Sequence, residues 1–376
     1  MVFNSTLTTT NKKLQILGTR GIPAAHGGFE TFAQGFSIYL AQKGWDVTVY
    51  CQEDGTGPIH EDDWQGIHRI HIPVKQEGAK GTIVFDWIST LHAAKRKIPV
   101  LTLGYNTAVF CLLYRLKGIK NIINMDGIEW QRDKWTPMQR AWLYINEKAG
   151  AWLGNHLIAD HPEIKNHLGR FVCDEKITVI PYSARLLKTA DQNYLSRFNL
   201  MPGRYAILIA RPEPENSILE IVRAYSDQKR GFPLVVLGNY DPNTNTYQKS
   251  VLDAAGDEIM FVGAIYDQKQ VQALRFYARF YIHGHTVGGT NPSLVEALGA
   301  GSPVLAHNNR FNRWVAGENS LYFSTESECA QKIGELIKND KLIASMKAAS
   351  QDQYRTKFTS RKIHGDYERI LTEHIN

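Results

Sequence analysis

Residues 281–304 read YIHGHTVGGTNPSLVEALGAGSPV, and this stretch decides the fold. A short apolar, β-rich run ends at His283. A turn of Gly, Thr, Asn and Pro then leads into a segment with helical periodicity, which closes at residues 299–303. The order strand, glycine-rich turn, helix and strand is typical of a parallel α/β sheet. The first turn of such a helix has backbone amides without internal partners, so it suits a phosphate.

Short apolar runs of the same kind recur along the chain and predict two doubly wound, Rossmann-like α/β domains. We expect a first domain over residues 1–183, a second over 184–357, and a C-terminal helix, about 358–376, that packs back on the first. The predicted strands are residues 14–18, 46–50, 67–72, 100–103, 121–125, 156–159 and 177–180, then 205–210, 234–238, 259–262, 280–283 and 303–306. The predicted helices are residues 29–43, 137–153, 217–229, 268–278, 293–299 and 326–339, followed by a helical tail from 345.

Bulk composition narrows the class of protein. With 376 residues, 43% of them hydrophobic, the chain can bury two cores. Four cysteines without a CxxC pair argue against a disulfide framework and a cysteine zinc site, and fit the reducing cytoplasm. Residues 1–12 are polar and threonine-rich, which predicts a frayed tail and no signal peptide. The net charge of +6 indicates either an ordinary solvated surface or an attraction to anionic partners, namely nucleotide phosphates or acidic lipid. No basic stripe points to nucleic acid.

Two loops that follow predicted strands offer groups for a phosphate. Residues 18–31, GTRGIPAAHGGFET, place Gly27 and Gly28 at a helix start, where amides can approach an anion closely. Their spacing is not GxGxxG and no Walker lysine is present, so a tight structural turn is the alternative. Arg211, in residues 210–216 (ARPEPEN), can grip a diphosphate through its forked donors, or be an ordinary surface arginine.

Carboxylates follow two strands of the first domain. Asp126 and Glu129 lie in residues 126–132 (DGIEWQR), and Asp160 follows the strand at 156–159. A negative charge near the reacting carbon stabilises an oxocarbenium-like transition state, which makes these three candidates for catalysis. As an alternative, Asp126 caps a turn and Asp160 caps a helix.

The glutamate and the histidines of residues 281–304 have different interpretations. Glu296, one turn into the predicted helix, can accept hydrogen bonds from a ribose diol. His283 and His285 have no carboxylate at zincin spacing, so we expect them to support the turn and predict no metal.

Residues 281–304 resemble the nucleotide-sugar signature of GT-B glycosyltransferases, in the large, mostly retaining family of bacterial mannosyl-, glucosyl- and rhamnosyltransferases. Together with residues 18–31 and 126–135, they look closest to the rhamnosyltransferases of surface-polysaccharide synthesis. The resemblance implies that Glu296 holds the ribose, Arg211 the diphosphate, and Gly27 and Gly28 the donor phosphates. The donor contacts that it implies in full are Gly27, Gly28, Arg211, Gly263, Gly289, Thr290, Asn291, Pro292, Ser293, Leu294 and Glu296.

The chain departs from that family at two positions. The family commonly has a second glutamate eight residues before the ribose-binding one, where this chain has Gly288. It also has a lysine shortly after the arginine, where Glu215 and Asn216 stand. The missing glutamate would contact a sugar hydroxyl, so a deoxygenated sugar fits its loss.

From these observations we predict a metal-independent glycosyltransferase without a cofactor, with an active site between the two domains. The expected donor is dTDP-L-rhamnose, and the expected acceptor is a saccharide on a polyprenyl diphosphate at the inner face of the cell membrane. Residues 112–120 and 135–152 mix apolar and basic side chains, which suits peripheral membrane contact or simple packing on the sheet. The rival predictions are a UDP- or GDP-hexose donor, a phosphorylase or epimerase of the same fold, and a nucleotide-binding protein without catalysis.

Overall fold

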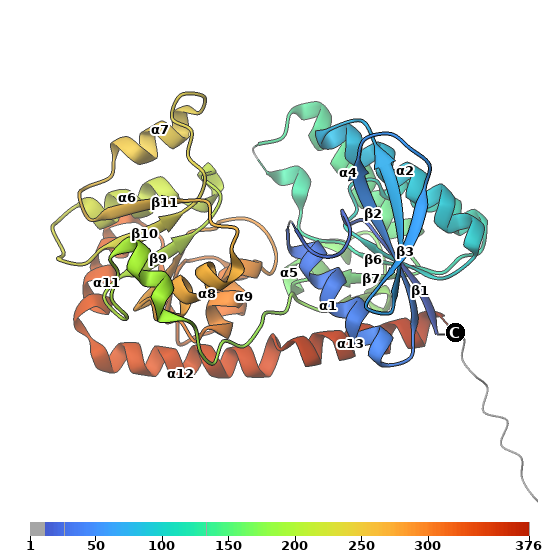
Figure 1. Ribbon diagram of the computed structural model, residues 1–376. Helices are drawn as coiled ribbons and strands as arrows, with labels where there is room; N and C mark the ends of the chain where they lie inside the picture. The colour runs from blue at the N-terminus through green and yellow to red at the C-terminus, as the bar shows by residue number, and fades with distance from the viewer. Residues whose placement is uncertain (1–11, 26, 133, 376) are drawn as a thin grey trace, which may run out of the picture. The chain divides into compact units, whose positions relative to one another are not determined.

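The computed structural model describes residues 12–25, 27–132 and 134–375 (Figure 1). The chain forms two compact units, residues 1–131, 135–180 and 364–376 in the first and residues 132–134 and 181–363 in the second. Each unit is built on one mostly parallel sheet, which confirms the α/β class with two doubly wound sheets. The predicted frayed tail at residues 1–12 lies, apart from Lys12, outside the described residues.

The first unit contains a sheet with the strand order β3-β4-β2-β1-β5-β6-β7-β8. Every neighbouring pair is parallel except β3 and β4. Apolar runs such as that of β5 are buried along most of their length, as expected for strands covered on both faces. The strands are β1 (Lys13–Leu17), β2 (Asp46–Asp54), β3 (His60–Trp64), β4 (Ile67–Val74), β5 (Val100–Leu103), β6 (Asn121–Asn124), β7 (His156–Ala159) and β8 (Ile177–Val179).

Two helices of the first unit begin at residues whose side chains cap them, Thr136 and His161. Helix α4 begins at Pro137, directly after its N-cap Thr136, which forms a capping box with Gln139. On α1, Phe32 and Phe36 pack against Tyr367 with tilted rings, at 4.6 and 5.3 Å between ring centroids, which ties the end of α13 to this unit. The helices are α1 (Gly28–Gln42), α2 (Gly78–Arg96), α3 (Leu112–Leu116), α4 (Pro137–Leu153), α5 (Pro162–Leu168) and, from residue 364, α13 (Ser360–Ile375).

The second unit has the all-parallel strand order β11-β10-β9-β12-β13-β14. Successive strand residues point to opposite faces, so Ile207 and Leu208 enter two separate apolar cores, one on each side of the sheet. The strands are β9 (Ala206–Ile209), β10 (Leu234–Leu237), β11 (Ile259–Gly263), β12 (Phe280–His283), β13 (Val304–His307) and β14 (Leu321–Phe323). The helices are α6 (Ile218–Ser226), α7 (Thr246–Asp253), α8 (Gln268–Tyr277), α9 (Pro292–Gly299), α10 (Arg310–Ala316), α11 (Glu326–Lys338) and α12 (Asp340–Lys357).

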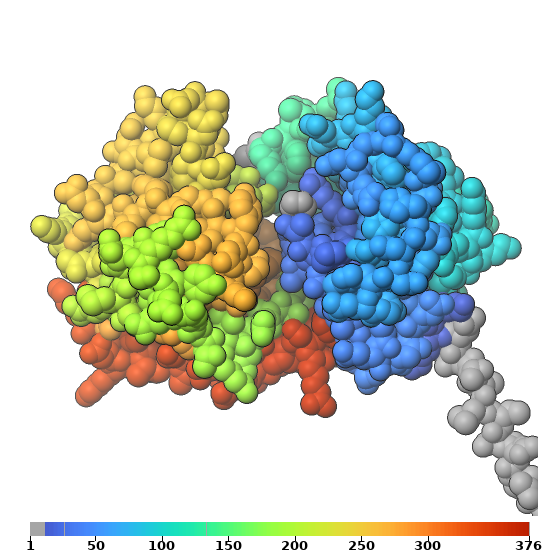
Figure 2. All heavy atoms as spheres, viewed as in Figure 1, coloured from blue at the N-terminus to red at the C-terminus, as the bar shows by residue number. Residues whose placement is uncertain are grey.

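The structure corrects the sequence prediction at one edge of each sheet. Strand β3, with the sequence HEDDW, and the short β14 carry no apolar alternation that would mark them. The predicted helical tail comprises two helices, α12 and α13, and Figure 2 shows α12, in red, on the surface of the second unit. Among the described residues, none of the helices has both the length and the apolar character that crossing a bilayer requires.

Candidate functional site

Each sheet has a switch point, where the strand order runs in opposite directions from two neighbouring strands that are not consecutive in the chain. In the second unit this place lies between β9 and β12, and in the first unit between β1 and β5. Ligands of open α/β sheets bind at such points, beyond the carboxyl ends of the strands. The loops with Arg211 and with Glu296 follow β9 and β12, and the loop with Gly27 follows β1.

The two loops of the second unit are held against each other. The backbone amide and the hydroxyl of Thr286 both donate to the carbonyl of Glu215, each at 2.9 Å. A Cβ on Gly284 would lie 2.1 Å from the carbonyl oxygen of Asn216, so only glycine permits this approach. The structure therefore brings the predicted arginine loop and the predicted signature loop together.

Arg132 joins this group. Its Nε donates to Glu215 at 2.6 Å and its Nη2 to Glu213 at 3.2 Å. The side chain of Glu215 is 7% exposed, so the ion pair is largely shielded from water. The guanidinium thus supplies a positive charge beside Glu215, one of the two residues that stand where the sequence resemblance implies a lysine. Sequence reasoning noted Arg132 in its motif but gave it no role.

The predicted ribose ligand, Glu296, lies on α9 and is 43% exposed. Its Oε2 accepts a hydrogen bond of 2.7 Å from Nη2 of Arg275, whose side chain on α8 is 4% exposed. A buried guanidinium therefore orients a carboxylate that remains accessible. Sequence reasoning missed Arg275, which lies 21 positions away on a different helix.

The start of α9 is less open than the sequence implied. The side chain of Asn291 accepts from the amide of Ser293 at 3.0 Å, so this amide already has a partner. The amides of Leu294 and Val295 donate to the carbonyl of Asn291. The hydroxyl of Ser293 lies 2.7 Å from that of the buried Tyr281, which sequence reasoning also missed. A phosphate at this helix start would have to compete with these bonds.

His283 and His285 stack with their ring centroids 4.3 Å apart. Burial holds the pKa of His283 well below its usual range, with His285 and His307 adding to the effect. Burial, together with the positive charges of Arg211 and Arg132, lowers the pKa of His285 to about 3. Both rings are therefore neutral at physiological pH. His285 also fixes the loop, since its carbonyl accepts from Asn309 and Asn312 at 2.9 and 2.8 Å.

The remaining predicted donor contacts of the second unit surround the same two loops or lie farther along the sheet edge. Gly289 is half-buried and Thr290 buried in the turn before α9, which begins at Pro292. Gly288, in the same turn, has a φ of +126°, a conformation that L-residues rarely adopt. Gly263 ends β11, which is separated from β9 by β10.

In the first unit, side chains of α1 hold the glycine-rich loop. Glu30 accepts from the amide of Arg20 at 3.1 Å, and Gln34 accepts from that of Ala24 at 2.6 Å. Gly27 and Gly28 form the start of α1, and a Cβ on Gly27 would lie 2.7 Å from a carboxylate oxygen of Glu30. This resident carboxylate favours the structural alternative for the turn, because it already occupies the positive end of the helix.

The three predicted carboxylates lie beyond β6 and β7. Asp126 has a φ of +50°, and its amide donates to the side chain of Asn124 at 2.9 Å. Asn124 in turn donates to the hydroxyl of Tyr367 at 2.7 Å. Burial raises the pKa of Tyr367 above its usual range, and the charges of Asp160 and Asp126 add to this effect, so both carboxylates lie in the surroundings of the Tyr367 hydroxyl.

Glu129 belongs to a neighbouring 3-10 turn, Glu129–Gln131. Its amide donates to the hydroxyl of the buried Tyr105 at 2.8 Å. That hydroxyl donates to the carbonyl of Gly127 at 3.1 Å. One tyrosine therefore fixes the backbone between Asp126 and Glu129.

A pocket that sequence reasoning missed lies at the β1/β5 switch point. Its wall includes Asp86, which accepts from the hydroxyl of Thr107 at 2.8 Å. Burial raises the pKa of Asp86 to about 6, against the lowering effect of this hydrogen bond. Other polar groups of the lining are Thr19, Arg20, Glu30, Gln52, Ser89, Thr90, Thr102 and Asn106.

Comparisons with known proteins agree with this geometry. Residues 11–185 match a family described as a domain of unknown function (DUF1972). No curated protein matches the chain in sequence. Sucrose-phosphate synthase from Thermosynechococcus elongatus superposes with a TM-score of 0.78 at 16% identity, over 96% of this chain and 98% of that one. Anabaena Alr3699/HepE, solved with UDP and glucose, gives a TM-score of 0.73 at 13% identity, over 96% and 100% of the two chains.

An alpha,alpha-trehalose-phosphate synthase (UDP-forming) from Burkholderia vietnamiensis gives a TM-score of 0.72 at 11% identity, over 95% of this chain and 99% of that one. The chain has the GT-B fold. At these identities the shared property is the fold. The GT-B fold was the one implied by the sequence resemblance, and it is confirmed.

Proposed function

We propose that the chain is a GT-B glycosyltransferase that moves a sugar from a nucleoside-diphosphate donor to a saccharide acceptor. The second domain, residues 184–357, would bind the donor, and the first, residues 1–183 with the C-terminal helix, the acceptor. One observation carries the proposal: Arg211, Arg132 and the Arg275–Glu296 pair gather around the β9/β12 switch point. The solved complex of HepE with UDP-glucose supports it, because it joins this fold to a nucleotide-sugar ligand.

In this proposal the protein supplies the positive charge that the leaving diphosphate needs. Arg211 forms no ion pair within the described part of the chain, so its guanidinium has its full charge to offer. Arg132 shares its charge with Glu213 and Glu215 and would act less directly. Glu296 would hold the ribose diol, and residues 289–294 would complete the donor contacts of the second domain. Preorganised cations of this kind replace a metal, and no cofactor takes part.

The sugar carbon would react beside the carboxylates of the first domain. Asp126 is the first candidate, since a non-glycine residue with positive φ is uncommon and such conformations gather at functional sites. Asp160 is the second candidate, and Glu129 the third. The pocket at the β1/β5 switch point, with Asp86 in its wall, would take an acceptor hydroxyl.

For the donor itself we propose dTDP-L-rhamnose, used with retention in surface-polysaccharide synthesis. A glutamate at position 288 would have to adopt a φ of +126°, so this loop shape disfavours the hydroxyl-binding glutamate of the relatives. The competing candidate is UDP-hexose, because UDP and glucose appear in the solved structure of HepE.

We further propose an acceptor on a polyprenyl diphosphate, reached at the cytoplasmic face of the membrane. Large apolar side chains are exposed on α3 and α4, among them Leu116 at 75%, Met138 at 84% and Trp152 at 62%. Arg115 and Arg140 lie on the same two helices. Apolar side chains with basic neighbours suit the interface of an acidic bilayer.

A donor competition tests these finer proposals. The purified chain is mixed with acceptor-containing membrane extract and equal amounts of dTDP-rhamnose, UDP-glucose and a GDP-sugar, and the consumption of each donor is measured. We expect dTDP-rhamnose to be consumed first. If UDP-glucose or the GDP-sugar is consumed at least as well, the rhamnosyl assignment is wrong and glycosyl transfer stands.

A further inference from the structure

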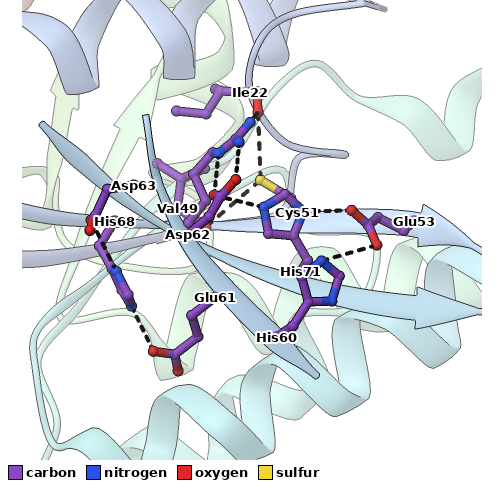
Figure 3. A network of polar contacts seen from close by, with 11 residues as sticks. Ile22, Val49, Cys51, Glu53, His60, Glu61, Asp62, Asp63, His68 and His71 are labelled. Carbon is purple, nitrogen blue, oxygen red and sulfur yellow. Dashed lines mark hydrogen bonds and ion pairs between the residues drawn. The ribbon is translucent and has the colours of Figure 1, made fainter. Parts of the chain in front are cut away.

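One edge of the first sheet carries a cluster of histidines and carboxylates that the proposed function does not use. In the register of β3 and β4, His60 lies directly opposite His71. On the other side of β4, His71 pairs with Cys51 of β2, and Glu53 follows two residues later, on the same face. Figure 3 shows that the side chains of His60, His71 and Glu53 converge. Strand pairing, and no loop, brings them together.

The distances within this triad are short. Nδ1 of His71 lies 2.7 Å from Oε1 of Glu53, and Nε2 of His60 lies 3.6 Å from Oε2 of the same carboxylate. One nitrogen of each ring and one oxygen of Glu53 all lie within 4.8 Å of one another. The two imidazole rings are parallel, with 4.8 Å between their centroids.

The second nitrogen of His71 has a partner of its own. Nε2 lies 2.9 Å from Oδ1 of Asp62, whose carboxylate is also bound by Nε and Nη2 of Arg69. A carboxylate on one ring nitrogen fixes the tautomer that donates to it and leaves the lone pair on the other nitrogen, the arrangement common behind metal-bound histidines. Nδ1 of His71, which lies 2.7 Å from Oε1 of Glu53 and makes no hydrogen bond within the described part of the chain, is then the nitrogen left to bind an ion.

We propose that His60, His71 and Glu53 bind a divalent transition-metal ion, with Zn²⁺ as the best fit. Two imidazoles and one carboxylate are a known zinc ligand set, and a fourth position stays open. Zinc bonds of about 2.0–2.2 Å require His60 to move inward, which is possible because its side chain is 53% exposed on an edge strand. The proposal of this site does not rest on the proposed transferase function.

The surroundings of the triad give the ion a route from solvent and link it to the glycine-rich loop. Glu53 and His71 line a pocket together with Arg20, Gly21 and Ile22 of the glycine-rich loop, so an ion can enter from solvent. Nη1 of Arg69 donates to the carbonyl of Ile22 at 2.9 Å. The chain of contacts from the triad through Asp62 and Arg69 therefore reaches the loop, and the bound ion would stiffen it.

The alternative is an imidazolium at His71 that bridges Glu53 and Asp62 without any metal. The two states are separated by titrating Zn²⁺ into the EDTA-stripped full chain and following the heat of binding. We expect about one Zn²⁺ per chain. Co²⁺ in its place should give the visible absorption of a low-symmetry site.

Variants locate the ion. His60→Ala should weaken Zn²⁺ binding about a hundredfold and Asp62→Asn roughly tenfold, since the first removes a ligand and the second the group that orients one. His68→Ala is the matched control. His68 also contacts two carboxylates, Glu61 at 3.0 Å through Nε2 and Asp63 at 3.3 Å through Nδ1. It lies on the opposite face of β4 from His71, because side chains alternate along a strand. Circular dichroism checks that each variant folds.

Two results would overturn the proposal. The first is the absence of stoichiometric Zn²⁺ binding by the folded wild-type chain. The second is unchanged affinity in the folded His60→Ala variant, or an equal loss in His68→Ala.

Discussion

Arg275 and Glu296 form an ion pair in which the buried partner positions the exposed one, with Nη2 and Oε2 2.7 Å apart. The guanidinium has almost no access to water, so the ion pair offsets part of the free-energy cost of burying its charge. The same bond fixes the direction of the carboxylate. Within the described residues, Oε1 of Glu296 accepts no hydrogen bond, so it can still bind a diol. The pair explains how one glutamate on a short helix can be held in a defined direction.

Glu296→Ala should raise the donor KM by about 10–100-fold, because hydrogen bonds to a charged group are lost. The variant also leaves Arg275 unpaired, so we expect a loss of roughly 1–3 kcal/mol in the free energy of unfolding. Steady-state kinetics and chemical denaturation measure the two effects. Glu335→Ala, an exposed helix position of the same unit, is the control. Wild-type kinetics in folded Glu296→Ala would remove the ribose assignment.

Arg211→Ala should lower turnover about 10²–10³-fold and weaken donor binding far less, because charge on the leaving diphosphate grows toward the transition state. Single-turnover rates and donor titrations separate the two quantities. Arg223→Ala, which removes an exposed arginine that is 53% accessible on α6, should leave both unchanged. Equal affinity and equal rate in Arg211→Ala would show an ordinary surface arginine.

Asp126→Asn should reduce turnover about a hundredfold while donor affinity stays within a factor of about two, since the lost charge acts on an oxocarbenium-like state. Asparagine tolerates positive φ, so the backbone of the loop should be kept. Asp174→Asn, at a carboxylate that is 70% exposed, serves as the control. A variant that loses donor binding in parallel with turnover would place Asp126 in ground-state binding instead.

Turnover should persist in excess EDTA, because the arginines supply the charge that the diphosphate requires. The rate is measured soon after the chelator is added and again after Zn²⁺, Mg²⁺ or Mn²⁺ is restored. A complete loss that Mg²⁺ or Mn²⁺ reverses and Zn²⁺ does not would mean that a metal meets the diphosphate. A loss that Zn²⁺ alone reverses would instead point to the triad of His60, His71 and Glu53 in the first unit.

Asp86 should make stability depend on pH. Its pKa is about 6 in the folded chain, against an ordinary 3.8, so the folded state holds the proton more tightly. Below pH 3.8 the group has no effect, between the two values stability falls as pH rises, and above pH 6 the full penalty of about 3 kcal/mol applies.

Asp86→Asn removes this penalty and can still accept from Thr107. Denaturation at pH 4 and pH 7 should therefore show the variant stabilised relative to wild type at pH 7, with little difference at pH 4. A variant that is less stable by the same amount at both values would contradict the buried-carboxyl account.

The sequence predicts the central strands well because they are apolar and β-rich, so β5, β7 and β12 have the predicted bounds. It fails at β3, where five residues of HEDDW form an edge strand held by pairing with β4. Edge strands often carry charged residues, which prevent pairing with other chains. These residues also remove the apolar alternation by which a strand is predicted from sequence. The histidine triad depends on this strand, so it could not be predicted either.

Contacts between side chains far apart in the sequence are the other part that stays hidden. Arg275 and Glu296 lie on different helices, and the pairing of Arg132 with Glu215 joins positions that are 83 residues apart. Motif spacing identifies Glu296 and Arg211 as candidates. The packing of the folded chain alone determines that the buried Arg275 holds Glu296 and that Arg132 lies beside Glu215.

The most direct test of the central claim is the release of nucleoside diphosphate from a panel of nucleotide sugars, measured with and without acceptor-containing extract. The account predicts that one donor yields nucleoside diphosphate at a rate that depends on the acceptor, with that rate abolished in a folded Asp126→Asn, Glu296→Ala double variant. No acceptor-dependent release from any donor, by a chain that circular dichroism shows to be folded, would contradict it and leave a nucleotide-binding protein without catalysis.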